Sequence, residues 1–154
     1  RLINELANFN VGQFIVTTSG RQSLEPFLES SLSSQLKFFS GIITYEDVSK
    51  HKPFPDAYNL AVQLSKKSKV NCLVIEDSKI GVQAAKAANL SCLLTLPPWT
   101  SSIQNISNKA NACVNSLGNI KNPSKLIYGE RLISNNVDYE YLTAIINKNA
   151  ENKI

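Results

Sequence analysis

The chain has 154 residues, of which 43% are hydrophobic and 18% are charged, and its formal net charge is +4. This length suits one domain with one core, and the composition excludes an intrinsically disordered chain. No basic segment is interleaved with aromatic residues, so we expect no nucleic-acid partner, whereas the mild positive charge suits a small anionic substrate.

The cysteines and the apolar runs indicate the compartment. Cys72, Cys92 and Cys113 lie within apolar runs, their number is odd, and their spacing is not that of paired metal ligands. We therefore expect buried free thiols in a reducing compartment. No apolar run approaches the ~18 residues of a membrane span, and no signal-peptide pattern opens the chain. These patterns predict a location in the cytoplasm, or in the soluble phase of an organelle, without a membrane partner.

A predicted helix over residues 1–8 and a β-branched strand over 14–17 open the chain. The polar turn 18–21, with the sequence TSGR, follows this strand and leads into a helix predicted over 24–31. Hydroxyl groups and a glycine after a strand expose donors that suit an oxyanion such as phosphate. An ordinary serine/threonine turn with a helix N-cap explains the same residues, so both interpretations stay open.

The next predicted strand covers residues 41–44, and a proline-rich segment with the sequence KPFPD follows it at 52–56. Its two prolines hold the backbone extended before a helix that we expect to begin at Pro55 or Asp56. Lys52 lies in this stiff segment, which suits a single ammonium directed at a phosphoryl group. A solvated loop lysine is the alternative.

Residues 72–75 form a short buried strand that ends in Glu76-Asp77, and a helix of small and apolar residues follows. Open α/β sheets carry their chemistry beyond the carboxyl ends of the strands. Two part-buried carboxylates repel each other unless a cation joins them, and Mg²⁺ takes oxygen ligands. In the alternative interpretation, Asp77 or Ser78 is a helix N-cap and Glu76 is a solvated neighbour.

The last third of the chain is less regular. The remaining predicted elements are a strand over 91–96, a loop or weak helix over 100–109, a short strand over 112–114, and a hairpin or two extended pieces over 125–134. We then expect a last helix whose Ile145 and Ile146 pack on the core, and a frayed polar tail from Asn147. Strands that alternate with helices predict an α/β fold with helices on both faces of a mostly parallel sheet. We divide it into an α/β core of residues 1–118 and a C-terminal extension of residues 119–154.

Three motifs occur in a fixed order: Thr18-Ser19, then KPFPDAY at 52–58, then EDSKIG at 76–81. In this order they resemble the haloacid dehalogenase superfamily, and within it the branch of CbbY-type, β-phosphoglucomutase-like and phosphoglycolate phosphatase-like proteins. The resemblance covers residues 14–117. It implies a Rossmann-like three-layer α/β/α fold and a Mg²⁺-dependent enzyme that transfers phosphoryl groups.

The resemblance also implies roles for individual residues. Thr18, with Thr17 as the register alternative, matches the hydroxyl residue of the family, and Lys52 matches its phosphate-binding lysine. Glu76 and Asp77 match its acidic metal-binding pair. The residues expected to help bind substrate are Ser19, Gly20, Arg21 and Ser78.

One family motif is missing. The family has DxD on its first strand, where the first Asp attacks phosphorus to form an aspartyl-phosphate, and no DxD occurs in this chain. The chain also begins with Arg1 and contains no methionine, so we expect the nucleophile and the cap domain to lie upstream. The strands at 14–17 and 72–75 should then flank an empty central position, either closing on each other or leaving an apolar slot.

The expected function is therefore hydrolysis of a small phosphorylated metabolite, with this chain inactive when it is alone. A sugar-phosphate mutase is one alternative, and an inactive phosphate- or protein-binding remnant is another. Dehalogenation is disfavoured because that branch of the superfamily acts without a metal. The sequence does not indicate an oligomeric state.

Overall fold

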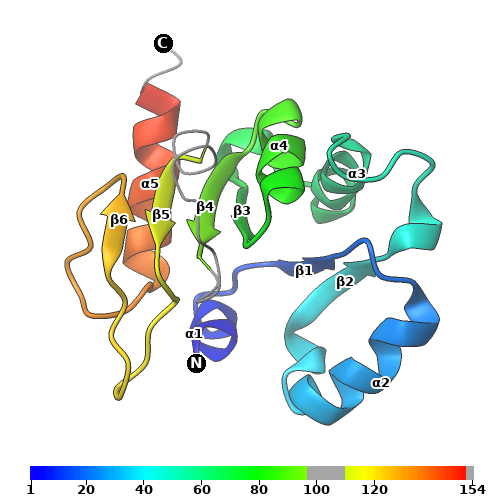
Figure 1. Cartoon of the computed structure of the whole chain (residues 1–154), viewed down its shortest axis with the longest axis horizontal. Helices are drawn as coiled ribbons and strands as arrows, with labels where there is room; N and C mark the ends of the chain where they lie inside the picture. The colour runs from blue at the N-terminus through cyan, green and yellow to red at the C-terminus, as the bar shows by residue number, and fades with distance from the viewer. Residues whose placement is uncertain (97–109, 152–154) are drawn as a thin grey trace.

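The computed structural model describes residues 1–96 and 110–151 (Figure 1). Its helices are α1 (Leu2–Asn8), α2 (Arg21–Leu32), α3 (Asp56–Ser65), α4 (Lys79–Ala87) and α5 (Tyr139–Glu151), with short 3₁₀ helices η1 (Leu36–Phe38), η2 (Tyr45–Asp47) and η3 (Lys69–Asn71). Its strands are β1 (Gln13–Val16), β2 (Phe39–Ile43), β3 (Leu73–Glu76), β4 (Ser91–Thr95), β5 (Ala112–Val114) and β6 (Leu126–Tyr128). Strands and helices alternate, which confirms the predicted α/β class.

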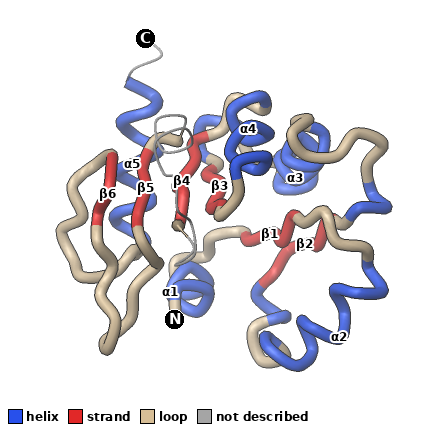
Figure 2. Tube along the Cα trace, viewed as in Figure 1, coloured by secondary structure: helices blue, strands red, loops and turns tan. Residues whose placement is uncertain are grey.

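The strands form two separate sheets (Figure 2). β1 pairs in parallel with β2, while β3, β4 and β5 pair in parallel and β6 joins β5 antiparallel. Among the described residues, no ladder joins β1 to β3. Of the two outcomes expected for these strands, direct closure is therefore excluded, and each strand ends a sheet.

Helices cover both faces of the larger sheet. Cys92 and Leu94 of β4 pack with α3 and α4, whereas Leu93, between them, packs with α1 and α5. Because successive side chains of a strand point to opposite faces, an uninterrupted apolar strand such as β4 requires cover on both sides. Three layers follow from this pattern. Cys92 and Cys113 are buried free thiols, as predicted, whereas Cys72 is only half-buried.

The C-terminal segment joins the same sheet and core. Residues 125–134 contain one strand, β6, and not the predicted hairpin or pair of extended pieces. The polar tail is also more regular than predicted, because α5 continues to Glu151 and Asn149 donates a hydrogen bond to Ser91 Oγ at 2.9 Å. The prediction for 100–109 lies outside the described residues. The division at residue 118 stays a prediction.

The N-terminus holds the segment that precedes α5. The Arg1 guanidinium donates hydrogen bonds to the backbone carbonyls of Leu117 and Val137 at 2.9 and 2.5 Å. Glu5 accepts a hydrogen bond from the backbone N–H of Tyr139 at 2.8 Å. These contacts join the two ends of the described chain, which lie in one layer.

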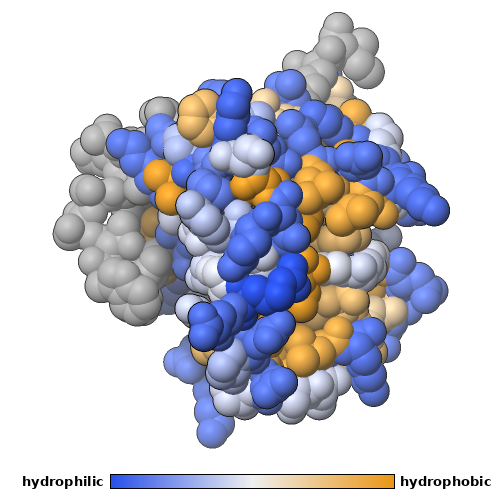
Figure 3. All heavy atoms as spheres, turned by 90° about the vertical axis from the view of Figure 1, so that its right-hand side faces the viewer, coloured by the Kyte–Doolittle hydropathy of each residue, from blue (hydrophilic) through white to orange (hydrophobic). Residues whose placement is uncertain are grey.

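The side of the molecule that carries α2 and α3 exposes apolar side chains. Figure 3 shows them as a band between hydrophilic residues. Large exposed apolar residues here are Phe27 of α2, Phe54 of the loop before α3, and Leu64 of α3. Leu64 lies seven residues after the buried Ala57, so helical spacing places both on one stripe of α3, but Leu64 is 54% exposed. None of the described helices is long and apolar enough to cross a bilayer.

We predict that Ile145→Ala destabilises the whole chain by about 2–5 kcal/mol, because a buried isoleucine leaves a cavity when it is truncated. Ile145 is 2% exposed and packs against the larger sheet. The control is Ile133→Ala, at a residue that is 93% exposed, which should change the unfolding free energy by no more than about 0.5 kcal/mol. Urea unfolding measures both. Equal small effects would show that α5 is not part of the core.

Candidate functional site

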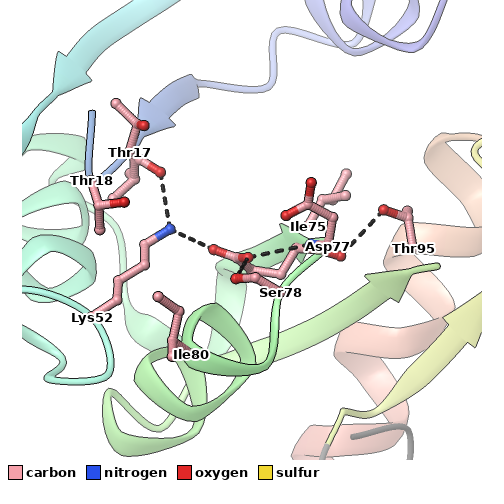
Figure 4. Close-up of a pocket in the computed structure, with 10 residues that line it drawn as sticks. Thr17, Thr18, Lys52, Ile75, Asp77, Ser78, Ile80 and Thr95 are labelled. Atoms are coloured by element: carbon pink, nitrogen blue, oxygen red, sulfur yellow. Dashed lines mark hydrogen bonds and ion pairs between the residues drawn. The ribbon is translucent and has the colours of Figure 1, made fainter. Parts of the chain in front are cut away.

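A cavity of about 480 Å³ lies at the carboxyl ends of β1 and β3 (Figure 4). Its lining residues are Val16, Thr17, Thr18, Lys52, Ile75, Glu76, Asp77, Ser78, Ile80 and Thr95. Five predicted site residues, namely Thr18, Lys52, Glu76, Asp77 and Ser78, therefore share one cavity. The slot that we expected to be apolar is lined by polar and apolar side chains together.

Lys52 connects the two sheets. It lies in the loop before α3, its side chain is only 8% exposed, and its ammonium donates to the Val16 carbonyl at 3.1 Å. The same ammonium donates to Glu76 Oε1 at 2.5 Å. Val16 ends β1 and Glu76 ends β3, so one buried cation links the ends of strands that share no backbone hydrogen bond. The alternative of a solvated loop lysine is wrong.

Glu76 is saturated with hydrogen bonds. Its Oε1 accepts from Lys52 Nζ and from the Tyr58 hydroxyl, and its Oε2 accepts from Ser78 Oγ at 2.9 Å and the Asp77 N–H at 3.3 Å. A carboxylate offers about four acceptor positions, so all of them are in use. Burial by itself would raise the pKa of Glu76, but the hydrogen bonds from Lys52, Tyr58 and Ser78, together with the positive charge of Lys52, outweigh it and hold the pKa below its ordinary value.

The spacing of EDSKIG follows from this carboxylate. Ser78 is the N-cap of α4, and its hydroxyl accepts from the Gly81 N–H at 3.1 Å while it donates to Glu76. A Cβ at position 81 would overlap the Glu76 carboxylate. Gly81 therefore makes room for the Glu76 side chain. Ser78 is an N-cap as the alternative interpretation held, but Glu76 is not a solvated neighbour.

Asp77 differs from Glu76. It is exposed, and its carboxylate accepts no hydrogen bond and forms no ion pair with the described part of the chain. Its two oxygens therefore remain available to a ligand at the cavity (Figure 4). Among residues 1–96 and 110–151, no group of three or more His, Cys, Asp or Glu side chains forms a metal cage. The donors that are present, hard carboxylate oxygens with space for water, fit the chemistry of Mg²⁺.

In the turn after β1, Thr17 and Thr18 line the cavity, whereas the three residues that follow do not. Thr17 Oγ1 accepts the Ser19 N–H at 3.0 Å, as in an ordinary serine/threonine turn, whereas the Thr18 hydroxyl has no hydrogen bond with the described residues. Ser19, Gly20 and Arg21 do not line the cavity. The Arg21 N–H donates to Glu46, and its guanidinium contacts Asp47 at 3.1 Å. The acidic helix η2 therefore engages Arg21 outside the cavity.

Two polar residues of the site were not predicted from the sequence. Thr95, at the end of β4, donates to the Glu76 carbonyl at 3.3 Å and lines the cavity. Tyr58, on α3, places its hydroxyl on Glu76 and its ring 4.8 Å from Lys52 Nζ. Burial and the adjacent Glu76 raise the pKa of Tyr58, so its hydroxyl remains a donor. The only signal in the sequence was the position of Tyr58 at the end of KPFPDAY.

Comparisons with known proteins identify relatives of this chain. The family model for haloacid dehalogenase-like hydrolases matches residues 1–95. The bifunctional riboflavin kinase/FMN phosphatase of Arabidopsis thaliana is 35% identical over 123 residues, which cover 79% of this chain and 31% of that protein. A CBBY-like protein of the same plant is 31% identical over 104 residues, which cover 65% of this chain and 31% of that relative.

The solved structures show the same fold. CbbY from Rhodobacter sphaeroides in complex with phosphate aligns with a TM-score of 0.68 and 25% identity, over 75% of this chain and 51% of the other. This likeness confirms the predicted Rossmann-like fold. The chain spans about a third of the length of the two plant relatives and about half of the length of the solved CbbY.

We predict that Gly81→Ala destabilises the chain by about 1–3 kcal/mol, because the added methyl group overpacks the site of the Glu76 carboxylate. In an ordinary helix the same change would be favourable by about 1 kcal/mol. Urea unfolding of a double-mutant cycle with Glu76→Ala measures the difference. Once the carboxylate is removed, Gly81→Ala should become neutral or stabilising. An equal cost in both backgrounds would contradict the assigned contact.

We predict that Lys52→Met costs about 3–5 kcal/mol at neutral pH, because it leaves the buried Glu76 carboxylate without its cation. The ordinary pKa of Glu76 is 4.5, and the pKa is lower than this in the folded chain. The ionised form therefore contributes stability above pH 4.5 that is lost as the pH falls through the folded value.

Unfolding free energies of the parent and of Lys52→Met, measured between pH 7 and pH 3, test this linkage. The difference between them should be largest at neutral pH and should shrink in acid. A difference that does not change with pH would mean that Lys52 does not stabilise the Glu76 charge.

Proposed function

Because this chain belongs to the haloacid dehalogenase-like hydrolase family, in its CbbY-like branch, we propose that it forms the phosphate- and metal-binding part of a phosphatase site. The substrate is a small phosphorylated metabolite. The observation that carries this proposal is the meeting of Lys52, Thr18 and Asp77 at one cavity beyond the carboxyl ends of β1 and β3.

Lys52 and Thr18 bind the phosphoryl oxygens in this proposal. The Lys52 ammonium, held by buried contacts, is a donor fixed before the ligand arrives. The Thr18 hydroxyl lines the same cavity and forms no hydrogen bond with the described residues, so it can donate to a ligand. Donors placed where negative charge develops stabilise the transition state, and the loss of one typically costs about 3–4 kcal/mol. Removal of Lys52 should therefore be more damaging than removal of Ser19 or Arg21, which lie outside the cavity.

Asp77, with Glu76 beside it, would hold Mg²⁺. When bound, the ion neutralises phosphate charge and orients the phosphoryl group for in-line attack. The Asp77 carboxylate accepts no hydrogen bond from residues 1–96 or 110–151, whereas the oxygens of Glu76 already accept four. Asp77 is therefore the stronger candidate for a direct ligand.

The nucleophile comes from outside this chain in our proposal. No DxD occurs in the 154 residues, and the relatives are two to three times as long as the parts that align. A strand between β1 and β3 would bring an Asp to the cavity, where its carboxylate would attack phosphorus and break the P–O bond to the metabolite, which would leave as an alcohol. Water would then hydrolyse the aspartyl-phosphate to inorganic phosphate and the free Asp. The exposed edges of β1 and β3 support this position.

Two other functions use the same cavity. A sugar-phosphate mutase would return the phosphoryl group to a sugar, and a non-catalytic domain would only bind phosphate. The absence of DxD favours the second for the chain alone. The phosphatase is preferred for the complete protein because one relative is an FMN phosphatase and the aligned CbbY structure holds phosphate.

We predict that the chain binds Mg²⁺ in the presence of inorganic phosphate, and that Asp77→Asn abolishes the calorimetric heat because it removes the charge of the free carboxylate. Lys52→Met should reduce phosphate binding in the same titration. Matched controls are Glu140→Gln and Lys121→Met, which change exposed charges far from the cavity.

Controls that behave like the parent, with loss of heat in Asp77→Asn and of phosphate binding in Lys52→Met, support the proposed site. An unchanged titration in Asp77→Asn would reject Asp77 as a ligand. No heat in the parent would favour a remnant without a phosphate site.

A further inference from the structure

Tyr58 is a buried polar residue of the site that ends the KPFPDAY motif. It is 4% exposed, its hydroxyl donates to Glu76 Oε1, and its ring lies 4.8 Å from the Lys52 ammonium. A phenylalanine would fill the same apolar space without a polar group to satisfy. Burial of a hydroxyl is favourable only when it is paired, so the pairing with Glu76 indicates what the hydroxyl does.

The hydroxyl shares one oxygen atom with Lys52. Glu76 Oε1 accepts from Lys52 Nζ and from Tyr58, whereas Oε2 accepts from Ser78 Oγ and the Asp77 N–H. If Lys52 turns toward a phosphate, Tyr58 is the donor that remains on Oε1. Without that hydroxyl, the departure of Lys52 would leave a buried carboxylate oxygen unpaired, which is costly.

The ring acts on Lys52 directly. An ammonium within about 6 Å of an aromatic ring is attracted to the face of the ring, and the attraction is stronger in a desolvated site. Lys52 is 8% exposed and Tyr58 is 4% exposed, so water does not compete for this contact. The ring therefore gives Lys52 a second support that is independent of Glu76.

We propose that Tyr58 is a positioning residue for phosphate binding: its hydroxyl holds the Glu76 carboxylate when Lys52 moves to the ligand, and its ring keeps Lys52 beside the cavity. This inference rests on the proposed function, because it assigns Lys52 to the phosphate. It makes Tyr58 part of the binding apparatus, although the cavity lining does not include it.

The test compares Tyr58→Phe with Tyr141→Phe. Tyr141 is also 4% exposed, and its hydroxyl donates to the Glu130 carbonyl on the opposite face of the sheet. Both variants lose one buried hydroxyl, so urea unfolding should show a loss of stability in each. Titration with inorganic phosphate in the presence of Mg²⁺ should show about tenfold weaker binding in Tyr58→Phe alone, the order of effect of one hydrogen bond to a charged group.

A second measurement follows Lys52 without any ligand. The aromatic ring shifts the NMR signals of the nearby Lys52 side chain, so these signals report its position. Tyr58→Phe keeps the ring and should change these shifts only if the hydroxyl helps to hold Lys52 through Glu76. Tyr58→Leu removes the ring as well and should weaken phosphate binding further than Tyr58→Phe does.

The outcomes are distinct. Weaker phosphate binding and altered Lys52 shifts in Tyr58→Phe, with neither in Tyr141→Phe, support the proposal. Parent-like phosphate binding in Tyr58→Phe overturns it and leaves Tyr58 a core residue. If the parent itself binds no phosphate, the proposed function fails, and unchanged Lys52 shifts in Tyr58→Phe then overturn the positioning role separately.

Discussion

The buried ion pair between Lys52 and Glu76 is the interaction on which this structure depends. The described strands form two sheets without a shared ladder, and the Lys52 ammonium contacts the end of each, at the Val16 carbonyl and the Glu76 carboxylate. A buried pair is often no more stable than an apolar pair of the same shape, but loss of one partner is costly. The pair therefore fixes the relative position of β1 and β3 at the point where the cavity lies.

Much of the fold was predictable because local patterns determine it. The continuous apolar run at 72–75 indicated a strand buried on both faces, but Ile75 of β3 is 38% exposed at the cavity, and β4 is the strand with cover on both sides. The proline pair correctly indicated where α3 begins. The burial of individual apolar residues was harder to predict, because the pattern does not show whether a residue faces the core or solvent. Leu64 lies on the solvent side of α3, although helical spacing groups it with the buried Ala57. Helical spacing identifies a stripe, but not whether a core or a cavity faces it.

The site was predictable as a set of residues and not as a set of contacts. The order of the three motifs indicated that Lys52, Glu76 and Asp77 belong together, and they line one cavity. Lys52 and Tyr58 are distant from Glu76 in sequence, however, so their hydrogen bonds to it were not predictable, and the spacing of Glu76 and Asp77 gave no reason to separate the roles of these two carboxylates. The structure separates them, since Glu76 accepts four hydrogen bonds and the Asp77 side chain accepts none from the described residues.

The different contacts of Glu76 and Asp77 bear on how the buried Lys52 could bind a ligand. In the proposed function, phosphate that enters the cavity would compete with Glu76 for the Lys52 ammonium, and a carboxylate that depended on Lys52 alone would retain it. Glu76 has three other donors, from Tyr58, Ser78 and the Asp77 N–H, so in this proposal Lys52 would turn to the anion while the carboxylate stays hydrogen-bonded. Both Lys52 and Tyr58 are placed by the segment that enters α3, and both Asp77 and Ser78 by the turn that enters α4. The segments at the N-termini of α3 and α4 therefore position Lys52 and Asp77, two of the charged residues that line the cavity.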